Sequence, residues 1–410
     1  MNHYSIGMVI LTLSALACSL ADADGNRVHF PKISPCQALT KGPKEHLFAS
    51  YYGINSWDLS ERYVTILETD VRNHVPSEKE PATLALVDVQ TKELIPLTQT
   101  KAWNFQQGCM AHWLGTAADD RIIYNDFREG KFVSVIMDVH TKQEMKVLDY
   151  PVSAVSPNGK EAICINFSRL RITREDYGYG GEGQDAREDV QFPEDDGLFL
   201  VDLETGQAQL LVSIAQAKSL VPEVPSDGLE YFNHTLFSRD GSKIFWLARA
   251  IPERNTTAFT VDRDGENLRR CFPDGWGGSH FDWLDADRLM ITAAYDAKVY
   301  GHILFTVGQD NYQRLGKGLL DYDGHGTFSP DGQWLVTDTY PGGKLREHKL
   351  YLMEMRTQAV MPMGRFVEPP EFNGGWRCDL HPRWSPRGDR IGINSTHSDS
   401  RQVYVFELSW

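Results

Sequence analysis

The sequence lacks an excess of basic residues and a long apolar run. Lysine and arginine number 41 against 56 aspartates and glutamates, which gives a formal net charge of -15 at pH 7. Nonspecific binding to nucleic acid needs a basic field, so we expect no nucleic-acid partner. No segment of the mature chain is apolar enough to cross a bilayer, so we also expect no transmembrane segment. An anionic ligand held by a local basic site remains compatible with this composition.

Cysteine is also scarce, with six residues in 410. Apart from Cys18, an odd number is scattered over the chain, so disulfides are not the main framework and at least one thiol stays free. The sequence has no Gly-x-Ser-x-Gly phrase, which argues against a hydrolase with a nucleophile elbow. Helical periodicity is nearly absent, and this favours an all-β fold.

The N-terminus carries an apolar run over residues 6–16, followed by small residues. This pattern is typical of a cleaved signal peptide, which we place at residues 1–23, with a secreted or periplasmic mature protein over residues 24–410. Lipid anchoring through Cys18 is the minority alternative, because Ala15 stands where a lipobox has leucine. We expect the mature protein to be a monomer.

Short β-rich runs recur after a repeated phrase of the form aromatic-Ser-Pro-Asp-Gly. Seven copies, three of them degenerate, precede runs such as residues 334–337, and a second run ending in a polar turn follows, as at residues 350–357. A spacing of roughly 45 residues between such units is typical of four-stranded propeller blades. We therefore predict a seven-bladed β-propeller with TolB-like repeats. The copies begin at Leu59, Trp113, Val155, Phe237, Trp283, Phe328 and Trp384.

Histidine occupies one equivalent position in four successive repeats. We call the residue four positions before the serine of each repeat, or its counterpart, the mouth position; its occupants are Ser56, Met110, Val152, His234, His280, His325 and His381. Equivalent residues of successive blades lie at one height around the axis, so we expect the four histidines to meet at the channel mouth. The interval from Val152 to His234 is nearly twice the usual one, and it contains an insertion at about residues 169–196.

Clustered imidazoles serve in metal ligation or proton transfer, and both need neutral rings near pH 7. Cys378 lies three residues before His381, so both can reach one ion, with sulfur favouring zinc. The structural alternative is that each histidine caps a turn and that the thiol is simply buried. With His280 and His325 on neighbouring blades, the pattern favours a metal site.

Cations and hydrogen-bond donors surround the same mouth. Arg377 and Arg383 flank His381, while Gln107 and His112 surround the mouth position of the second repeat. Singly, each arginine suits an ion pair between blades, but jointly they suit a carboxylate ligand. The insertion carries Tyr177, a phenol that can act as a proton shuttle or pack the loop against its blade.

These phrases resemble the propeller-fold polysaccharide lyases, a group that includes oligogalacturonate lyases and ulvan lyases. The resemblance lies in residues 377–386, in Ser279-His280-Phe281-Asp282-Trp283, and in Asp323-Gly324-His325 with the repeat that follows it. It implies β-elimination on a uronic-acid polysaccharide or oligosaccharide. In that reaction a metal or arginine neutralises the uronate carboxylate before a base removes the neighbouring proton.

The resemblance also implies roles for the candidate residues. It makes Tyr177 and His234 the acid/base candidates, and it gives His112, Arg377 or Arg383 the grip on the carboxylate. The full set comprises catalytic candidates Tyr177, His234 and His112; substrate-binding candidates Arg377, Arg383, Gln107 and Arg187; and metal candidates His280, His325, Cys378 and His381.

The sequence departs from the oligogalacturonate lyase pattern at its most specific phrase. Those enzymes resemble Gln-x-x-His-x-His, whereas this chain has Cys378-x-x-His381-x-Arg383. We therefore expect a divalent metal, zinc before manganese or calcium, and an ulvan-type substrate before a pectic one. Ulvan lyases pair their tyrosine with an arginine about sixteen residues on, but Arg187 is only ten beyond Tyr177. The alternative function is a noncatalytic TolB-like scaffold that binds a protein or glycan at the channel mouth.

Overall fold

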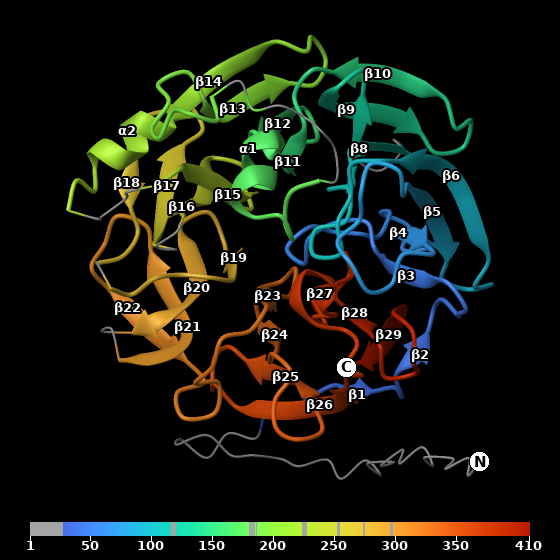
Figure 1. Cartoon of the computed structure of the whole chain (residues 1–410). Coiled ribbons are helices and arrows are strands. Elements are labelled where there is room, and N and C mark those ends of the chain that lie inside the picture. Colours follow the sequence, from blue (N-terminus) through green and yellow to red (C-terminus); the bar gives the residue numbers. More distant parts are fainter. Residues whose placement is uncertain are drawn as a thin grey trace.

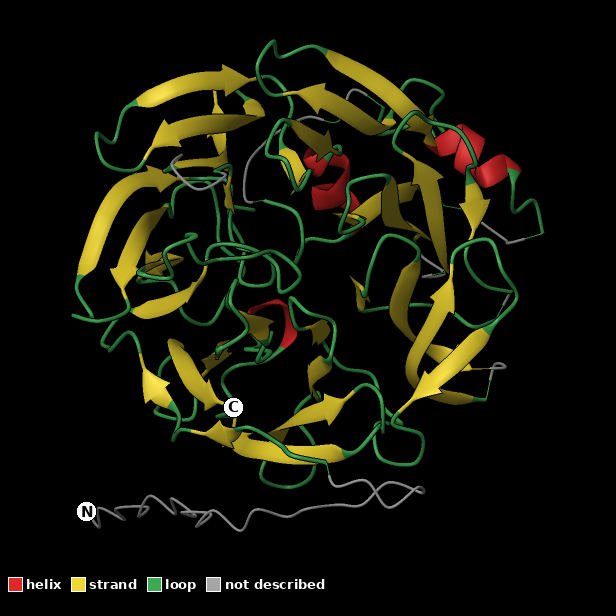
Figure 2. Cartoon of the chain, turned by 180° about the vertical axis from the view of Figure 1, so that it is seen from behind, coloured by secondary structure: helices red, strands yellow, loops and turns green. Residues whose placement is uncertain are grey.

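Seven antiparallel sheets surround a central axis in the computed structural model (Figure 1). The structure describes residues 28–410 except 116–119, 180–184, 186, 224–227, 252–254, 274 and 296–297. This architecture confirms the predicted seven-bladed propeller. The predicted signal peptide and part of the predicted insertion lie outside the described residues. Figure 2 shows that helix contributes only short segments between the sheets.

Each sheet is one blade, and its strands follow each other in chain order from the axis outward, apart from the last blade. The first three blades comprise β3 (Glu45–Phe48), β4 (Tyr63–Thr69), β5 (Ala82–Asp88), β6 (Leu94–Thr100); β7 (His112–Trp113), β8 (Arg121–Arg128), β9 (Lys131–Asp138), β10 (Glu144–Leu148); and β11 (Val152–Val155), β12 (Glu161–Cys164), β13 (Gly197–Asp202), β14 (Ala208–Ser213).

The remaining blades comprise β15 (Glu230–Phe237), β16 (Lys243–Ala250), β17 (Thr256–Asp262), β18 (Arg269–Arg270); β19 (Phe281–Trp283), β20 (Arg288–Tyr295), β21 (Val299–Thr306), β22 (Tyr312–Leu315); β23 (Gly326–Phe328), β24 (Trp334–Asp338), β25 (Glu347–Glu354), β26 (Val360–Val367); and β27 (Arg383–Trp384), β28 (Arg390–Ser395), β29 (Gln402–Ser409) with β1 (Lys32–Ile33) and β2 (Gln37–Ala38). The helices are α1 (Phe167–Thr173), α2 (Ile214–Ser219) and the 3₁₀ helix η1 (Gly374–Trp376).

The repeated Ser-x-Asp-Gly phrase forms the hairpin between the first two strands of a blade. In the sixth blade, Ser329 Oγ donates to Asp331 at 2.6 Å and accepts from the Trp334 amide at 3.0 Å. Gly332 has φ +70°, a left-handed conformation that glycine adopts without steric cost. The phrase is thus a turn signal, and this explains why it marks every well-formed repeat.

The two ends of the chain share the last blade. The N-terminal strands β1 and β2 both pair antiparallel with β29, with Ile33 opposite Leu408 and Ala38 opposite Tyr404. Strands β27 to β29 come from the C-terminus, so this pairing joins the first described segment to the last blade. The ring is closed by hydrogen bonds between segments far apart in the sequence.

The first blade departs from the regular pattern on its axial side. Its inner strand β3 ends at Phe48, and the chain returns to the sheet only at Trp57, which bridges to Val64. The intervening loop buries Tyr51 and Tyr52, and the Tyr52 hydroxyl donates to the Phe281 carbonyl of the fifth blade at 2.9 Å. This loop therefore spans the channel below the mouth.

The insertion between β12 and β13 contains α1, which lies on the axial side of its blade in Figure 1. Asn166 caps α1 by accepting from the Arg169 amide at 3.0 Å. The buried Arg169 guanidinium donates to Asp185 at 3.2 Å and to the Val190 carbonyl at 2.7 Å. These contacts fix the described part of the insertion against its blade.

The cysteines of the described chain are all free, as expected for a fold without a disulfide framework. The core consists of the apolar residues between neighbouring sheets, with large aromatic side chains such as Trp57, Trp103, Trp246 and Trp283 fully buried. Over the described residues, no helix has the length and hydropathy that a membrane span requires.

Candidate active site

The histidines at the mouth positions converge, as the repeat alignment predicts. The ring centroids of His280 and His325 lie 3.9 Å apart, and those of His325 and His381 lie 4.3 Å apart. The ring of His234 stacks on Tyr51, a residue of the loop between β3 and β4, with the ring centroids 4.7 Å apart. All four histidines are buried. Residues from four successive blades thus form one cluster.

Backbone strain accompanies these positions. His234 and His381 have φ values of +57° and +49°, and Met110 at the same position of the second blade has φ +53°. Such left-handed conformations cost non-glycine residues about 1–3 kcal/mol, and they persist where the surrounding structure enforces them. Two of the four histidines are therefore held in place at a conformational cost.

A buried carboxylate fixes the orientation of His325. Its Nδ1 donates to Asp338 at 2.9 Å, and its backbone amide donates to the same carboxylate at 2.7 Å. Burial would raise the pKa of Asp338, but the charge and hydrogen bonds of His325 lower it instead. A carboxylate only accepts, so His325 carries a proton on Nδ1, and Nε2 is the ring nitrogen left for a ligand.

His280 repeats this arrangement one blade earlier. Its Nδ1 donates to Asp323 at 2.8 Å, and its Nε2 accepts from the Tyr340 hydroxyl at 3.3 Å. Thr292 also donates to Asp323, at 2.7 Å. Burial works to raise the pKa of Asp323, but His280 lowers it to about 2. Histidine backed by carboxylate is the arrangement that orients metal-binding and catalytic imidazoles.

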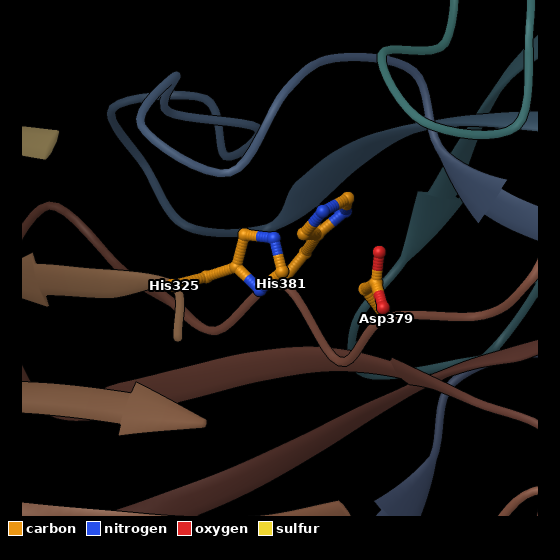
Figure 3. A group of neighbouring side chains, drawn as sticks. All are labelled: His325, Asp379 and His381. Carbon is orange, nitrogen blue, oxygen red and sulfur yellow. The ribbon is translucent and has the colours of Figure 1, made fainter. Parts of the chain in front are cut away.

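Of the residues that the structure describes, His325, Asp379 and His381 form the one group whose donor atoms could share a metal ion. One donor atom from each residue lies within 4.8 Å of the others, and all three residues are buried (Figure 3). The Nε2 atoms of His325 and His381 are buried without a hydrogen-bond partner. Buried polar atoms of this kind need an explanation, and a metal ion supplies one.

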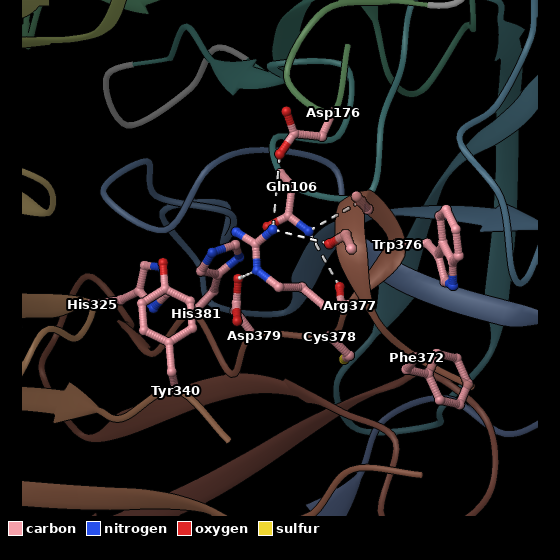
Figure 4. A network of polar contacts seen from close by, with 12 residues as sticks. Gln106, Asp176, His325, Tyr340, Phe372, Trp376, Arg377, Cys378, Asp379 and His381 are labelled. Atoms are coloured by element: carbon pink, nitrogen blue, oxygen red, sulfur yellow. Dashed lines mark hydrogen bonds and ion pairs between the residues drawn. The ribbon is translucent and has the colours of Figure 1, made fainter. Parts of the chain in front are cut away.

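Cys378 does not join this group, although the sequence analysis gives it a ligand role. Figure 4 shows its side chain directed away from His381, while the next residue, Asp379, lies on the histidine side. Burial raises the pKa of the Cys378 thiol to about 12, so the thiol is protonated at neutral pH. The structure thus gathers nitrogen and oxygen donors, and the sulfur ligand stays a prediction without geometric support.

Arg377 connects the metal-binding candidates to the insertion. Its Nε lies 2.8 Å from an Asp379 oxygen (Figure 4). Its Nη2 donates to the Tyr177 hydroxyl at 3.3 Å. Burial opposes the charge, but Asp379 and the neighbouring phenols raise the pKa of Arg377 further. The guanidinium is therefore a fixed cation between the histidines and Tyr177, in keeping with its predicted role at a carboxylate.

Tyr177 and His234 are also in contact, as expected for an acid/base pair. Their rings meet edge to face at 5.1 Å, and Asn104 holds the tyrosine backbone through its carbonyl at 2.9 Å. The amide of Gln107 donates to His234 Nδ1 at 3.3 Å, which leaves the ring proton on Nε2. Gln107 therefore contacts a candidate catalytic residue directly.

Burial favours the uncharged form of His234, His280 and His381. It lowers the pKa of both His234 and His381 well below the usual value, with nearby arginines and histidines adding to the effect. Burial also lowers the pKa of His280, and His325 adds to the shift, although Asp323 opposes it. Neutral imidazoles are the form that binds metal and takes up protons.

Three other predicted residues make their shortest side-chain contacts outside this cluster. His112 donates from Nδ1 to the Met110 carbonyl at 2.7 Å, and burial lowers its pKa to about 4. Arg383 points inward, where it donates to Ser56 at 2.8 Å, and burial lowers its pKa to about 9. Arg187 pairs with Asp195 on the surface. Their predicted roles gain no support from this geometry.

Sequence reasoning missed several residues of the cluster. Asp379 stands inside the phrase that carried the family resemblance, but the spacing gave no sign that its side chain faces the histidines. Asp338 ends β24 and Tyr340 follows it, so neither belongs to a repeated mouth position. The loop that carries Tyr51 and Tyr52 breaks the repeat, and no periodic signal marks it.

Fold and site together define a seven-bladed propeller with a buried histidine and carboxylate centre at the mouth of its channel. No family model matches the sequence, and no curated protein matches it. Among solved structures, the fold is similar to an oligogalacturonate lyase from Vibrio parahaemolyticus, at 14% identity over 95% of both chains with a TM-score of 0.64.

A second similar structure is an oligogalacturonate lyase in complex with manganese, at 15% identity over 95% of both chains with a TM-score of 0.66. The tricorn protease is similar at 10% identity and a TM-score of 0.53, over 90% of this chain but 34% of that one. At these identities the likenesses establish the propeller fold, and they assign no reaction.

Proposed function

We propose that the protein is a lyase that cleaves a uronate-containing glycan by β-elimination at the mouth of the propeller channel. The observation that carries this proposal is that one arginine links two groups of residues. Arg377 contacts Asp379 of the buried metal-binding group, which also contains His325 and His381, and it contacts Tyr177 as well. A uronate needs charge neutralisation at its carboxylate and a base at the adjacent carbon, and this arrangement holds groups suited to both.

The donor set fits a divalent metal. Two buried imidazole nitrogens without partners and one buried carboxylate suit zinc or manganese, and the Asp338 carboxylate behind His325 keeps its Nε2 available. A bound metal supplies Lewis-acid neutralisation of the substrate carboxylate. His280, beside His325 and backed by Asp323, is placed to add a further nitrogen.

Tyr177 carries both proton transfers in this proposal, and His234 lies beside it. Tyr177 acts as a phenolate, whose own proton leaves to solvent before the step. The phenolate oxygen takes the proton from C5 of the uronate, and the electron pair of that C–H bond forms the C4–C5 double bond. The C4–O bond breaks, and the phenol returns the proton to the leaving oxygen, so that the phenolate is regenerated. Gln107 donates to Nδ1 of His234, which keeps the ring proton on Nε2, so this neutral ring is suited to donate a hydrogen bond to an oxygen of the reacting groups. Arg377 holds the reacting carboxylate beside Tyr177 through Nη2, while its Nη1 faces Asp176.

The two most similar solved structures considered above are named oligogalacturonate lyases, and one holds manganese. These likenesses support the pectic alternative, so we place oligogalacturonates beside ulvan-type glycans in the proposed substrate class, and manganese beside zinc among the proposed metals. Export through residues 1–23 and monomeric action on an extracellular or periplasmic glycan belong to the same proposal.

The test is incubation of the purified protein with polygalacturonate, its oligomers, ulvan, alginate and glucuronan while the ultraviolet absorbance of the unsaturated product is recorded. We expect a steady rise on at least one uronate that chelation abolishes and added manganese or zinc restores. Tyr177→Phe should keep the metal and lose turnover. Absence of any rise over the whole panel would contradict the lyase and leave the noncatalytic propeller as the better account.

A further inference from the structure

A pocket of about 540 Å³ lies above the histidine cluster, where the segment after α1 meets the segment around η1. Its lining comprises Val75, Arg174, Glu175, Asp176, Gly374, Gly375, Trp376 and Arg377. Arg377 belongs both to this pocket and to the proposed reaction centre. The pocket is therefore the space next to the site where cleavage is proposed.

Asp176 holds the two arginines of the pocket. Its carboxylate accepts from Arg174 Nε at 3.1 Å and from Arg174 Nη2 at 3.2 Å, and it lies 3.9 Å from Arg377 Nη1 (Figure 4). Two guanidinium groups that converge on one oxyanion form a site for a planar carboxylate. In this structure the chain supplies that carboxylate itself.

Both arginines also contact the proposed base. The Arg174 guanidinium lies over the Tyr177 ring at 4.8 Å from its centroid, and Arg377 donates to the Tyr177 hydroxyl. A carboxylate bound between the arginines would lie beside the reacting sugar. The side chains of Arg174, Asp176 and Arg377 are each about a fifth exposed, with values of 24%, 23% and 19%, so a ligand in the pocket can reach them.

The approach of Asp176 to the last blade depends on a glycine. A Cβ atom at Gly375 would lie 2.9 Å from Asp176 Cβ and 3.1 Å from a Val75 methyl carbon. Any larger residue at this position would push the Asp176 segment away from η1. The segment that carries Asp176 thus packs closely against η1, and this close packing requires that residue 375 has no side chain.

We propose that Asp176 is a built-in substitute for a substrate carboxylate: it occupies an anion subsite between Arg174 and Arg377, from which the carboxylate of a neighbouring uronate displaces it. This inference rests on the proposed lyase function. It adds that the substrate carries a second uronate next to the one that reacts. It also makes Asp176 a competitor of substrate.

The experiment is calorimetric titration of saturated trigalacturonate into metal-loaded protein that carries Tyr177→Phe, which prevents turnover. Asp176→Asn keeps the size of the side chain and removes its charge. We expect the Kd for trigalacturonate to fall roughly fivefold, because the substrate carboxylate no longer has to displace a partly exposed ion pair. Arg174→Gln should raise the Kd roughly tenfold. Gly375→Ala, which displaces Asp176 by crowding, should act in the same direction as Asp176→Asn.

Two controls isolate the subsite. Arg288→Gln removes a surface arginine that pairs with Asp285 outside the pocket lining, and it should leave the Kd unchanged. A fully methyl-esterified trimer has no carboxylate, and Asp176→Asn should not strengthen its binding. Equal or weaker trigalacturonate binding by Asp176→Asn would overturn the inference while leaving the lyase intact. Failure of all variants and of the unmodified protein to bind any uronate would overturn both.

Discussion

At the scale of single residues, the pairing of His325 with Asp338 positions the metal-binding group. Asp338 also accepts from the His381 backbone amide at 3.1 Å, so one buried carboxylate positions residues of two blades. An asparagine at position 338 keeps the shape of the side chain but has no charge, so the N–H at Nδ1 of His325 loses its carboxylate partner. The effect on metal binding should therefore be large although Asp338 is no ligand.

We predict that Asp338→Asn weakens manganese or zinc binding about 10–100-fold, the usual effect of losing a residue behind a metal-ligating histidine. Equilibrium dialysis with metal analysis measures it. His381→Ala should abolish specific binding altogether. Cys378→Ser distinguishes a site of nitrogen and oxygen ligands from a site that includes the thiol. Retained metal supports His325, Asp379 and His381 as the ligands, whereas loss of metal would show that Cys378 is a ligand.

At the scale of elements, closure of the ring depends on short strands. Strand β1 comprises two residues, and β2 two more, yet together they cover one edge of β29. Without them the last blade would expose an edge strand, and the segment that carries Asp379 and His381 would lose support.

We predict that a chain beginning after β2, at Leu39, keeps its sheet content but unfolds at a temperature several degrees lower. Circular dichroism during heating measures this. A matched chain that begins at Val28 and keeps both strands should unfold like the longer protein. An unchanged midpoint for the chain that begins at Leu39 would show that closure adds no stability.

The elements also show how far the sequence could lead. The turn phrase predicts the blades because in four of its seven copies a serine and a left-handed glycine shape the hairpin, as at Ser329 and Gly332. The regular spacing identifies the three degenerate copies. The convergence of the histidines follows from the same repeat. Asp379 and Tyr52 could not be predicted, because the direction of a side chain outside a strand depends on packing that no periodic pattern encodes.

At the scale of the whole molecule, buried histidines make stability depend on pH. Five of them have pKa values lowered mainly by burial, namely His112 and His302 to about 4, His234 and His381 well below the usual value, and His280 by an amount that Asp323 opposes. Unfolding exposes these rings, which then bind protons near pH 6.5. Stability contributed by such groups is complete above pH 6.5 and is lost as the pH falls towards the lowered values.

Several other groups oppose this trend. Burial raises the pKa of Glu230 to about 7 and that of Asp282 to about 6, and it also raises the pKa values of Glu61 and Asp196. Against the effect of burial, Glu368 raises the pKa of His348. All these shifts favour the folded state as the pH falls. The five histidines outweigh them, and each titrating group changes stability by about 1.4 kcal/mol per pH unit. We predict a net loss of several kcal/mol in the free energy of unfolding between pH 7 and 5, measured by urea denaturation. A flat or rising profile would contradict it.

The propeller brings the metal-binding group, the cationic Arg377 and the Tyr177–His234 pair to one end of its channel from four different segments. That convergence has a chemical purpose in the proposed β-elimination, which breaks the glycosidic C–O bond without adding water. Hydrolysis by the same residues would add water to the sugar.

The most direct measurement is mass spectrometry of the products formed from a uronate oligomer in heavy-oxygen water. The products are reduced at early times, before the anomeric oxygen of the new reducing end exchanges with solvent. The account predicts an unsaturated product, no heavy oxygen at the new reducing end, and no reaction in Tyr177→Phe. Heavy oxygen at the cleaved bond in saturated products would contradict elimination and with it the central claim.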